Sequence, residues 1–437
     1  MAGVTLMKTP AETGLVQAFE TVKATLPGDV ESRAQAFELF ERNGLPHRRV
    51  EEFKYTDLRA LMREVAPFAK VPSADEAKTA LRDAKALAEI NALQVPFVNG
   101  HFVRDAVDFK NLPEGVEIVP LAEALASGHD WLTRLSPVEW ARQNPVYQLN
   151  SSFMADGVMI RIVGQVTTPV HLRFVTSSAS AVATATRVLV LIEDGASVKL
   201  LETHESTNGV SHQPNDVVEL IAGDQTNVHH VRVNAEGDQA LALSTFAVKI
   251  GAEASFNSIN VVAGSATSRH QVFAILNGEN TKAQINGATM LKGRQHGDST
   301  LVVEHAAPHC ESRELFKTVV DNEATGVFQG KIIVPHHAQK TDGRMMSAAL
   351  LLADGAAMNN KPELEIFADD VQCAHGATCG QLDEDLLFYL MARGIPKKEA
   401  ESLLIQAFLG EAIEFVDNED VREALVHTVE EWLKART

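Results

Sequence analysis

A cysteine and a histidine stand two positions apart near the C-terminal end of the chain, at Cys373 and His375. In an extended segment alternate side chains share a face, so this thiol and this imidazole point the same way. Sulfur and nitrogen donors of this kind suit zinc or iron. A closed zinc site has four ligands and a catalytic one at least three, so two ligands make half a site. The pair predicts a site that is labile or completed by a partner chain; the alternative is a small buried cysteine beside a hydrogen-bonded histidine.

Other potential ligands are less specific. Cys379 comes just before a helical pattern and is expected to be a small buried residue rather than a ligand. His305, His309 and Cys310 lie close together in the sequence. Pro308, between them, favours a turn, so the two imidazoles and the thiol need not converge on one ion.

Histidines are concentrated in a strand-rich part of the chain, where 11 of the 16 lie between residues 204 and 375. A histidine on a strand that alternates between two faces is usually a solvated surface residue. We therefore expect surface positions for His204, His212, His229, His230, His270 and His296.

Acidic residues outnumber basic ones by 58 to 39, which gives a formal net charge of −19. This balance repels phosphate backbones and excludes a nucleic-acid partner. Residues 361–437 contain 17 acidic and 7 basic residues, so more than half of the excess charge lies there. Three cysteines cannot build a disulfide framework, and there is no signal-peptide pattern or long apolar run. We expect a cytoplasmic protein without a membrane partner.

The spacing of apolar residues changes twice along the chain, which predicts three regions. Residues 1–150 are expected to be mostly helical, since Phe37 and Phe40 fall at helical spacing before a Gly-Leu-Pro stop. Residues 151–375 carry short runs of Val, Ile, Leu and Thr that alternate with polar residues, as strands do. Residues 376–437 return to helical spacing and are expected to form a C-terminal helical domain.

A repeat runs through the strand-rich region. Similar turns recur around Gly195, Gly223, Gly251 and Gly278, at spacings of 28, 28 and 27 residues. A period of this length is typical of a solenoid, in which each unit completes a core with its neighbours. Units made only of strands predict a parallel β-helix of on the order of eight to ten coils. A β-sandwich, which also has short strands and frequent turns, is the alternative.

Signatures of several enzyme classes are missing. Lys331 ends a glycine-containing segment that lacks P-loop spacing, so we expect the chain itself not to hydrolyse ATP. Hydrolase and thiol-redox motifs are also absent from the sequence. Asp369 and Asp370 are adjacent, so a strand directs them to opposite faces, which disfavours a carbohydrate-active β-helix enzyme. A stand-alone zinc-binding protein built on the cysteines and histidine above is the other alternative.

Several long segments resemble the SufB/SufD family of iron-sulfur cluster assembly proteins. They are Pro46 to Thr56, Ser312 to Lys317, Phe328 to Ile332, Ala338 to Asp342, Pro362 to Thr378 and Arg393 to Ile405. The resemblance spans roughly residues 44–416. It implies a mainly β fold: a right-handed parallel β-helix core flanked by N-terminal and C-terminal α-helical regions. Ser347 and Gly376 stand where SufB carries a cysteine and a glutamate, so the chain looks like the SufD branch.

The resemblance also implies a non-catalytic scaffold role. Members of that branch pair with SufB through the β-helices and bind the ATPase SufC through the C-terminal helices. His375 is then expected to face the SufB interface where a nascent cluster assembles, with Cys373 a weaker candidate. ATP hydrolysis by SufC is expected to shift the two β-helices and admit iron and sulfide. We expect a transient iron-sulfur cluster or iron at that interface, none tightly bound in the isolated chain, and a homodimer as a further possibility when the chain is alone.

Overall fold

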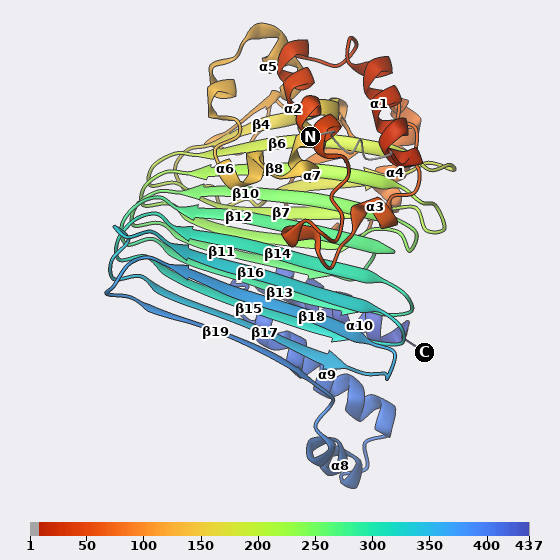
Figure 1. Cartoon of the computed structure of the whole chain (residues 1–437), viewed down its shortest axis with the longest axis vertical. Helices are drawn as coiled ribbons and strands as arrows, with labels where there is room; N and C mark the ends of the chain where they lie inside the picture. Colours follow the sequence, from red (N-terminus) through yellow and green to blue (C-terminus); the bar gives the residue numbers. More distant parts are fainter. Residues whose placement is uncertain (1–7, 437) are drawn as a thin grey trace, which may run out of the picture.

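Two β-sheets face each other along the axis of a β-helix, and from β4 onward successive strands of the chain alternate between them (Figure 1). The computed structural model describes residues 8–436. Nearly every neighbouring pair within a sheet is parallel. This pattern confirms the predicted parallel β-helix and excludes the β-sandwich, whose sheets are antiparallel.

Each coil supplies one strand to each sheet. Sheet A contains, in spatial order, β18 (Ala357–Ile366), β16 (Thr325–Val334), β14 (His296–His305), β12 (Thr267–Leu276), β10 (Leu241–Ile250), β8 (Gln213–Ala222), β6 (Ala183–Ile192), β4 (Asp156–Ile162) and β3 (Val116–Pro120). Sheet B contains β19 (Gln372–Gly380), β17 (Asp342–Leu351), β15 (Glu311–Val320), β13 (Lys282–Leu291), β11 (Ser255–Val262), β9 (Asn227–Ala235), β7 (Ser197–Ser206), β5 (Val170–Thr176), β1 (Leu93–Val98) and β2 (His101–Phe102). Strand pairing therefore runs from residue 93 to residue 380.

The glycine repeat of the sequence marks one row of turns. Gly223, Gly251 and Gly278 directly follow β8, β10 and β12 or lie one residue beyond. A Cβ atom at Gly278 would lie 2.1 Å from the backbone nitrogen of Ala252, and one at Gly251 would lie 2.6 Å from the carbonyl carbon of Gly223. Neighbouring coils stack so closely at these three turns that a side chain does not fit, whereas Gly195 has open space around it and instead a φ of 71°, which favours glycine.

Every second side chain of the strands fills the space between the sheets, as the pleat requires. The enclosed core includes Phe246 and Phe328 from sheet A and Phe256 from sheet B, each at most 1% exposed. This interior extends along the axis to the last coils, where Met345 of β17 belongs to it. Inward-facing residues of β19 therefore lie at one end of a continuous core.

Helices of the N-terminal third lie mainly against the outer face of sheet A, where Phe37 and Phe153 pack with Ala185 and Leu243. The elements are α1 (Pro10–Val22), α2 (Val30–Asn43), η1 (Glu51–Phe53), α3 (Leu58–Leu61), α4 (Ala74–Asp83), η2 (Arg104–Ala106), α5 (Leu121–Ser127), η3 (Asp130–Arg134), α6 (Glu139–Arg142) and α7 (Pro145–Phe153). Helix α4 is an exception, because it packs on sheet B.

A buried ion pair fastens the segment around η1 to sheet A. The side chains of Arg269 on β12 and Asp298 on β14 are both 0% exposed and form a salt bridge. Arg269 also lies 4.1 Å from the ring centroid of Phe53 and donates a hydrogen bond to the carbonyl of Glu52 at 2.8 Å. The Thr56 hydroxyl donates to Asp298. One paired charge thus joins two coils to the N-terminal segment.

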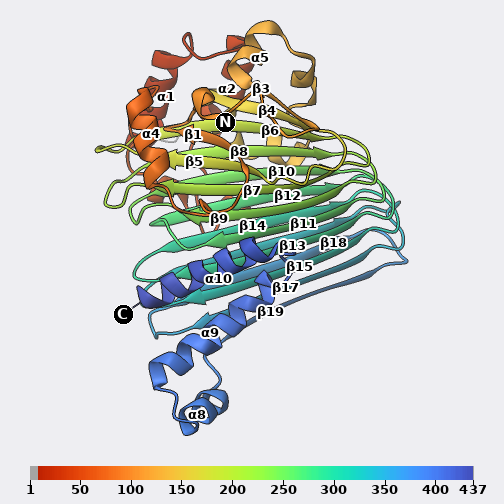
Figure 2. The same cartoon turned by 180° about the vertical axis from the view of Figure 1, so that it is seen from behind.

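Three helices follow β19: α8 (Glu384–Ala392), α9 (Lys397–Ile413) and α10 (Glu419–Lys434). Helices α9 and α10 lie across the outer face of sheet B, whereas α8 projects past its last strand (Figure 2). Leu409 and Leu425 are fully buried against the sheet. Lys317 of β15 reaches Glu411 of α9 at 2.7 Å, so polar contacts also fix this hairpin.

The two ends of the β-helix differ. At the N-terminal end the short strands β2 and β3 pair antiparallel with β1 and β4 and close both sheets. At the other end β18 and β19 are the last strands, and within residues 8–436 no further strand pairs with them. No residue of β18 is buried, and the following Phe367 is 63% exposed. The last coil is therefore uncovered, and we call it the open end.

Candidate functional site at the open end

Cys373 and His375 lie on the inward face of β19. In the parallel register Cys373 pairs with Gly343 and His375 with Met345, and Met345 points into the enclosed core with 2% exposure. Cys373 is half-buried and packs against that core, whereas His375 is exposed. The thiol and the imidazole thus share one face, as alternation predicts. Among the residues that the structure describes, no further coil covers the end of the β-helix at β19.

The electrostatic surroundings favour a neutral thiol at Cys373. Burial raises the pKa of Cys373, a backbone hydrogen bond from Gly343 lowers it, and the carboxyls of Asp342 and Glu314 raise it further. A metal ion reverses this preference, because a coordinating thiol is deprotonated outright. Across residues 8–436 no three His, Cys, Asp or Glu side chains are assembled as a metal site. The open end therefore offers two donors rather than a closed site.

Cys379 also belongs to the inward face of β19, but it is exposed, so the expectation of a buried cysteine is wrong. It lies at the uncovered end of the coil, where inward-facing residues have no next coil above them. The Asn360 amide donates a hydrogen bond to its sulfur at 3.3 Å, and the Ser347 hydroxyl donates to Asn360 at 2.7 Å. Cys379 is therefore a second thiol on the same open face.

The donors around Pro308 do not converge. Cys310 is 0% exposed, and its thiol donates to the carbonyl of Gly278 at 3.1 Å. His305 faces the interior, where its Nε2 lies 2.9 Å from the Ser312 hydroxyl, and burial lowers the pKa of His305 to about 4. His309 lies in the turn with φ of 58°. Cys310 and His305 are therefore engaged with different partners.

The expectation of surface histidines is wrong for four of the six residues. The buried ones are His204, His212, His230 and His270, each at most 5% exposed. His204, His230 and His270 are strand residues on the inward face, which the two sheets enclose, whereas His212 lies just before β8. His229 and His296 are partly exposed.

Sequence reasoning missed an ionic cluster inside the β-helix. The Glu202 carboxylate lies 2.6 Å from His204, 3.1 Å from His230 and 2.9 Å from Arg232. Burial alone would raise the pKa of Glu202, but hydrogen bonds from the two histidines and the charge of Arg232 hold it well below its usual range. The signal was present, because Glu202 and His204 have the same parity along β7 as the core residue Leu200.

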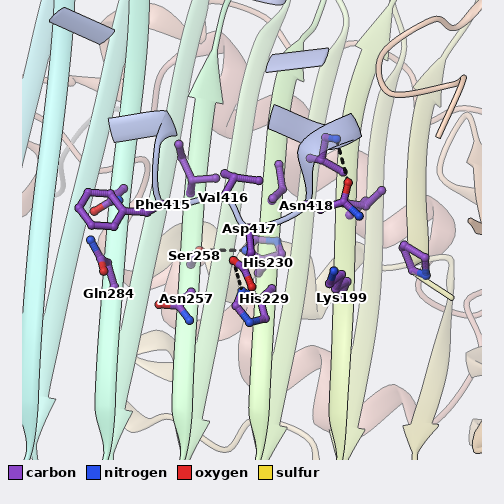
Figure 3. A pocket seen from close by; sticks show the side chains of 16 residues that line it. Lys199, His229, His230, Asn257, Ser258, Gln284, Phe415, Val416, Asp417 and Asn418 are labelled. Carbon is purple, nitrogen blue, oxygen red and sulfur yellow. Dashed lines mark hydrogen bonds and ion pairs between the residues drawn. The ribbon is translucent and has the colours of Figure 1, made fainter. Parts of the chain in front are cut away.

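A pocket lies between sheet B and the segment that joins α9 to α10 (Figure 3). His229 of β9 points toward Asp417 of that segment, and their Nδ1 and Oδ1 atoms are 3.1 Å apart. The cavity of about 30 Å³ accommodates only one or two water molecules. We interpret it as the joint between the C-terminal hairpin and the β-helix rather than as a ligand site.

Helix α8 carries a second exposed feature. None of its residues is buried, and its apolar side chains are open to solvent. They are Leu386, Phe388, Tyr389 and Met391, with exposures between 43% and 73%. Exposed apolar side chains gathered on one element are typical of contacts between proteins.

Comparison with known proteins places these features in a family context. Residues 174–408 match the model for the SufBD core domain of SUF-system FeS cluster assembly, and residues 25–172 match the model for the SufBD N-terminal region. None of the helices in residues 8–436 is long and apolar enough to span a bilayer.

Individual relatives agree with these matches. An iron-sulfur cluster assembly SufBD family protein of Synechocystis is 31% identical over 398 residues, covering 88% of this chain and 87% of the relative. Iron-sulfur cluster assembly protein SufD of Escherichia coli is 29% identical over 402 residues, covering 88% of each chain. The chloroplastic protein ABCI7 of Arabidopsis thaliana is 32% identical over 241 residues, covering 54% of this chain and 50% of the relative.

Proposed function

Because the chain belongs to the SufB/SufD family of iron-sulfur cluster assembly proteins, we propose that it is the SufD-type scaffold subunit of an assembly complex. The observation that carries this proposal is the half-site at the open end: Cys373 and His375 share one uncovered face. A scaffold must release the cluster that it helps to build. Two donors hold iron less firmly than the four of a closed site, which suits a transient cargo.

We assign the open end to a SufB-like partner. β18 and β19 present unpaired backbone groups, and a second β-helix end can pair with them strand to strand. Such pairing would bring the partner's ligands to Cys373 and His375 and complete the site. In the absence of SufB the same edges can pair with a second copy of this chain.

We assign α8 and its neighbours to a SufC-like ATPase. The apolar residues of α8 are exposed, and the helical region that contains it holds much of the acidic excess. Helices α9 and α10 fix this unit to sheet B, so a movement of the ATPase can reach the β-helix. In this proposal the chain performs no catalysis itself, ATP hydrolysis belongs to the partner, and the complex acts in the cytoplasm.

Substitution of His375 by alanine tests the role of the half-site. In a complex reconstituted with SufB-like and SufC-like partners, we expect His375→Ala to leave assembly intact and to lower the yield of cluster and bound iron. His336→Ala, an exposed histidine in a turn, is the matched control. An unchanged cluster yield in an intact His375→Ala complex refutes the role of His375, and failure of both partners to bind the native chain refutes the scaffold proposal.

A further inference from the structure

A cavity of about 550 Å³ lies between α4 and the segment formed by β2 and η2, at the end of the β-helix opposite the open end. Figure 2 shows α4 beside β1 at this end. Cavities of ~300–1,000 Å³ are typical of small-molecule sites. The cavity at the joint of the C-terminal hairpin is far smaller, at about 30 Å³. The scaffold proposal gives the larger cavity no role.

One face of α4 forms the first wall of this cavity. The helical residues that line it fall at positions i, i+3, i+4 and i+7, so they share a face. Two of them are alanines, and their small side chains leave space above the helix for a ligand. Val98 of β1 packs against the same helix, which fixes α4 to sheet B. The four residues are Ala74, Ala77, Lys78 and Leu81.

The opposite wall comes from β2 and η2. His101 pairs with Val98, so both side chains lie on the face of the hairpin that α4 covers. Val103 packs against α4, whereas Phe102 faces the core of the β-helix. Arg104 also lines the cavity, but its charge is paired with a carboxylate of α5. His101 is therefore the polar side chain of β2 that is available to a ligand.

Two nitrogen-bearing side chains line the cavity without a partner. Within residues 8–436 neither the Lys78 ammonium nor the His101 ring forms an ion pair or a side-chain hydrogen bond. Lys78 is exposed and His101 is half-buried, so both can reach a ligand. Asp105 is the single carboxylate among the lining residues. Acidic residues outnumber basic ones in this chain, yet this lysine has no acidic partner, so the cavity favours an anion.

We propose that the cavity binds a small monocarboxylate with an apolar body. The Lys78 ammonium pairs with the carboxylate, and the His101 ring, which keeps an N–H donor in either protonation state, donates a hydrogen bond to it. The apolar body lies against Leu81 and Val103. Asp105 repels a second negative charge, so the site selects a monocarboxylate over a dicarboxylate. This site is separate from the open end and goes beyond the scaffold role.

Two probes with the same apolar body and different charge test the site. Naphthylacetate is a monocarboxylate, whereas naphthylacetamide is its neutral amide. Titration of each probe with the full chain, followed by the NMR line width of the probe, gives the two Kd values. Exposed ion pairs contribute modestly, so we expect naphthylacetate to bind the native chain about 3- to 5-fold more tightly than naphthylacetamide.

Three variants locate the binding. Lys78→Gln removes the charge, and we expect naphthylacetate to bind it about 3- to 5-fold more weakly, with the Kd of naphthylacetamide unchanged. Lys110→Gln is the matched control, because Lys110 is an exposed lysine outside the cavity, and we expect native Kd values. Ala74 is exposed at the start of α4, so Ala74→Trp can fill the cavity without disturbing the core. We expect Ala74→Trp to lose both probes.

Thermal melting checks that each variant is folded, and the Lys78→Gln comparison decides the question even if Ala74→Trp does not fold. Native Kd values in a folded Ala74→Trp chain place the probes elsewhere and overturn the inference. A preference for naphthylacetate that persists in Lys78→Gln, or no saturable binding by the native chain, also overturns it. None of these results affects the scaffold proposal, which is tested by capture of the partners and by cluster yield.

Discussion

Truncation of Phe388 to alanine is expected to weaken binding of a SufC-like ATPase by about 6- to 40-fold, since a tenfold change in Kd corresponds to ~1.4 kcal/mol. Phe388 is 73% exposed on α8, a helix without buried residues. Full burial of a phenylalanine side chain contributes ~1.5–3 kcal/mol. About three quarters of that surface is still available for a partner to bury, which corresponds to ~1.1–2.2 kcal/mol.

Isothermal titration calorimetry of the purified chain with the ATPase measures this change. Because Phe388 makes no buried contact within the chain, we expect the free energy of unfolding to stay within ~0.5 kcal/mol of the native value. Val71→Ala is the matched control, since Val71 is 74% exposed but precedes α4 in the N-terminal region. A Kd for Phe388→Ala within twofold of the native value would refute the assignment of α8 as the docking helix.

Two further substitutions test features outside the proposed site. Asp298→Asn leaves the buried Arg269 without its charged partner, so the free energy of unfolding should fall by ~3–5 kcal/mol, measured as a lower urea midpoint. The double variant with Arg269→Met should recover much of this loss. A loss below ~1 kcal/mol in Asp298→Asn contradicts the reasoning. Burial and the charge of Arg173 lower the pKa of His171 to about 3. Between pH 6.5 and pH 3 the unfolded chain therefore binds a proton that the folded chain excludes, so the free energy of unfolding decreases as the pH decreases. His171→Gln removes this titrating group, so its free energy of unfolding should rise relative to that of the native chain by ~2 kcal/mol between pH 6.5 and 5. Parallel pH profiles of the two proteins would contradict the reasoning.

The length of a coil and the faces of the strands could be predicted from the sequence, through the glycine repeat and the alternation of side chains. Turn stacking leaves no room for a Cβ at Gly251 and Gly278, so their spacing of 27 residues lies within one residue of the coil length, which is 26 between the paired positions Ile250 and Leu276. Alternation along β19 likewise predicts that Cys373 and His375 share a face, because the pleat has a period of two. These inferences depend on local geometry alone.

Burial was harder to predict, because it depends on which coils cover which faces. His204 and His230 were expected at the surface, yet both lie inside the β-helix, where they contact Glu202 beside Arg232. Cysteine is a residue type that is usually buried, but Cys379 lies on the last coil of the described residues and is exposed. Periodicity identifies the strands, whereas the position of the final coil decides whether the inward face of β19 is core or surface.

The asymmetry between the two ends of the β-helix limits how many copies can assemble. A solenoid with two free ends can add units head to tail without closure and grow into a fibre. Here the sheets end on one side in the short antiparallel strands β2 and β3, so the proposed end-to-end pairing would use only the open end and would stop after one event. In the proposed assembly, two β-helices that meet through their open ends would form a finite pair with a single seam and therefore a single place for a cluster.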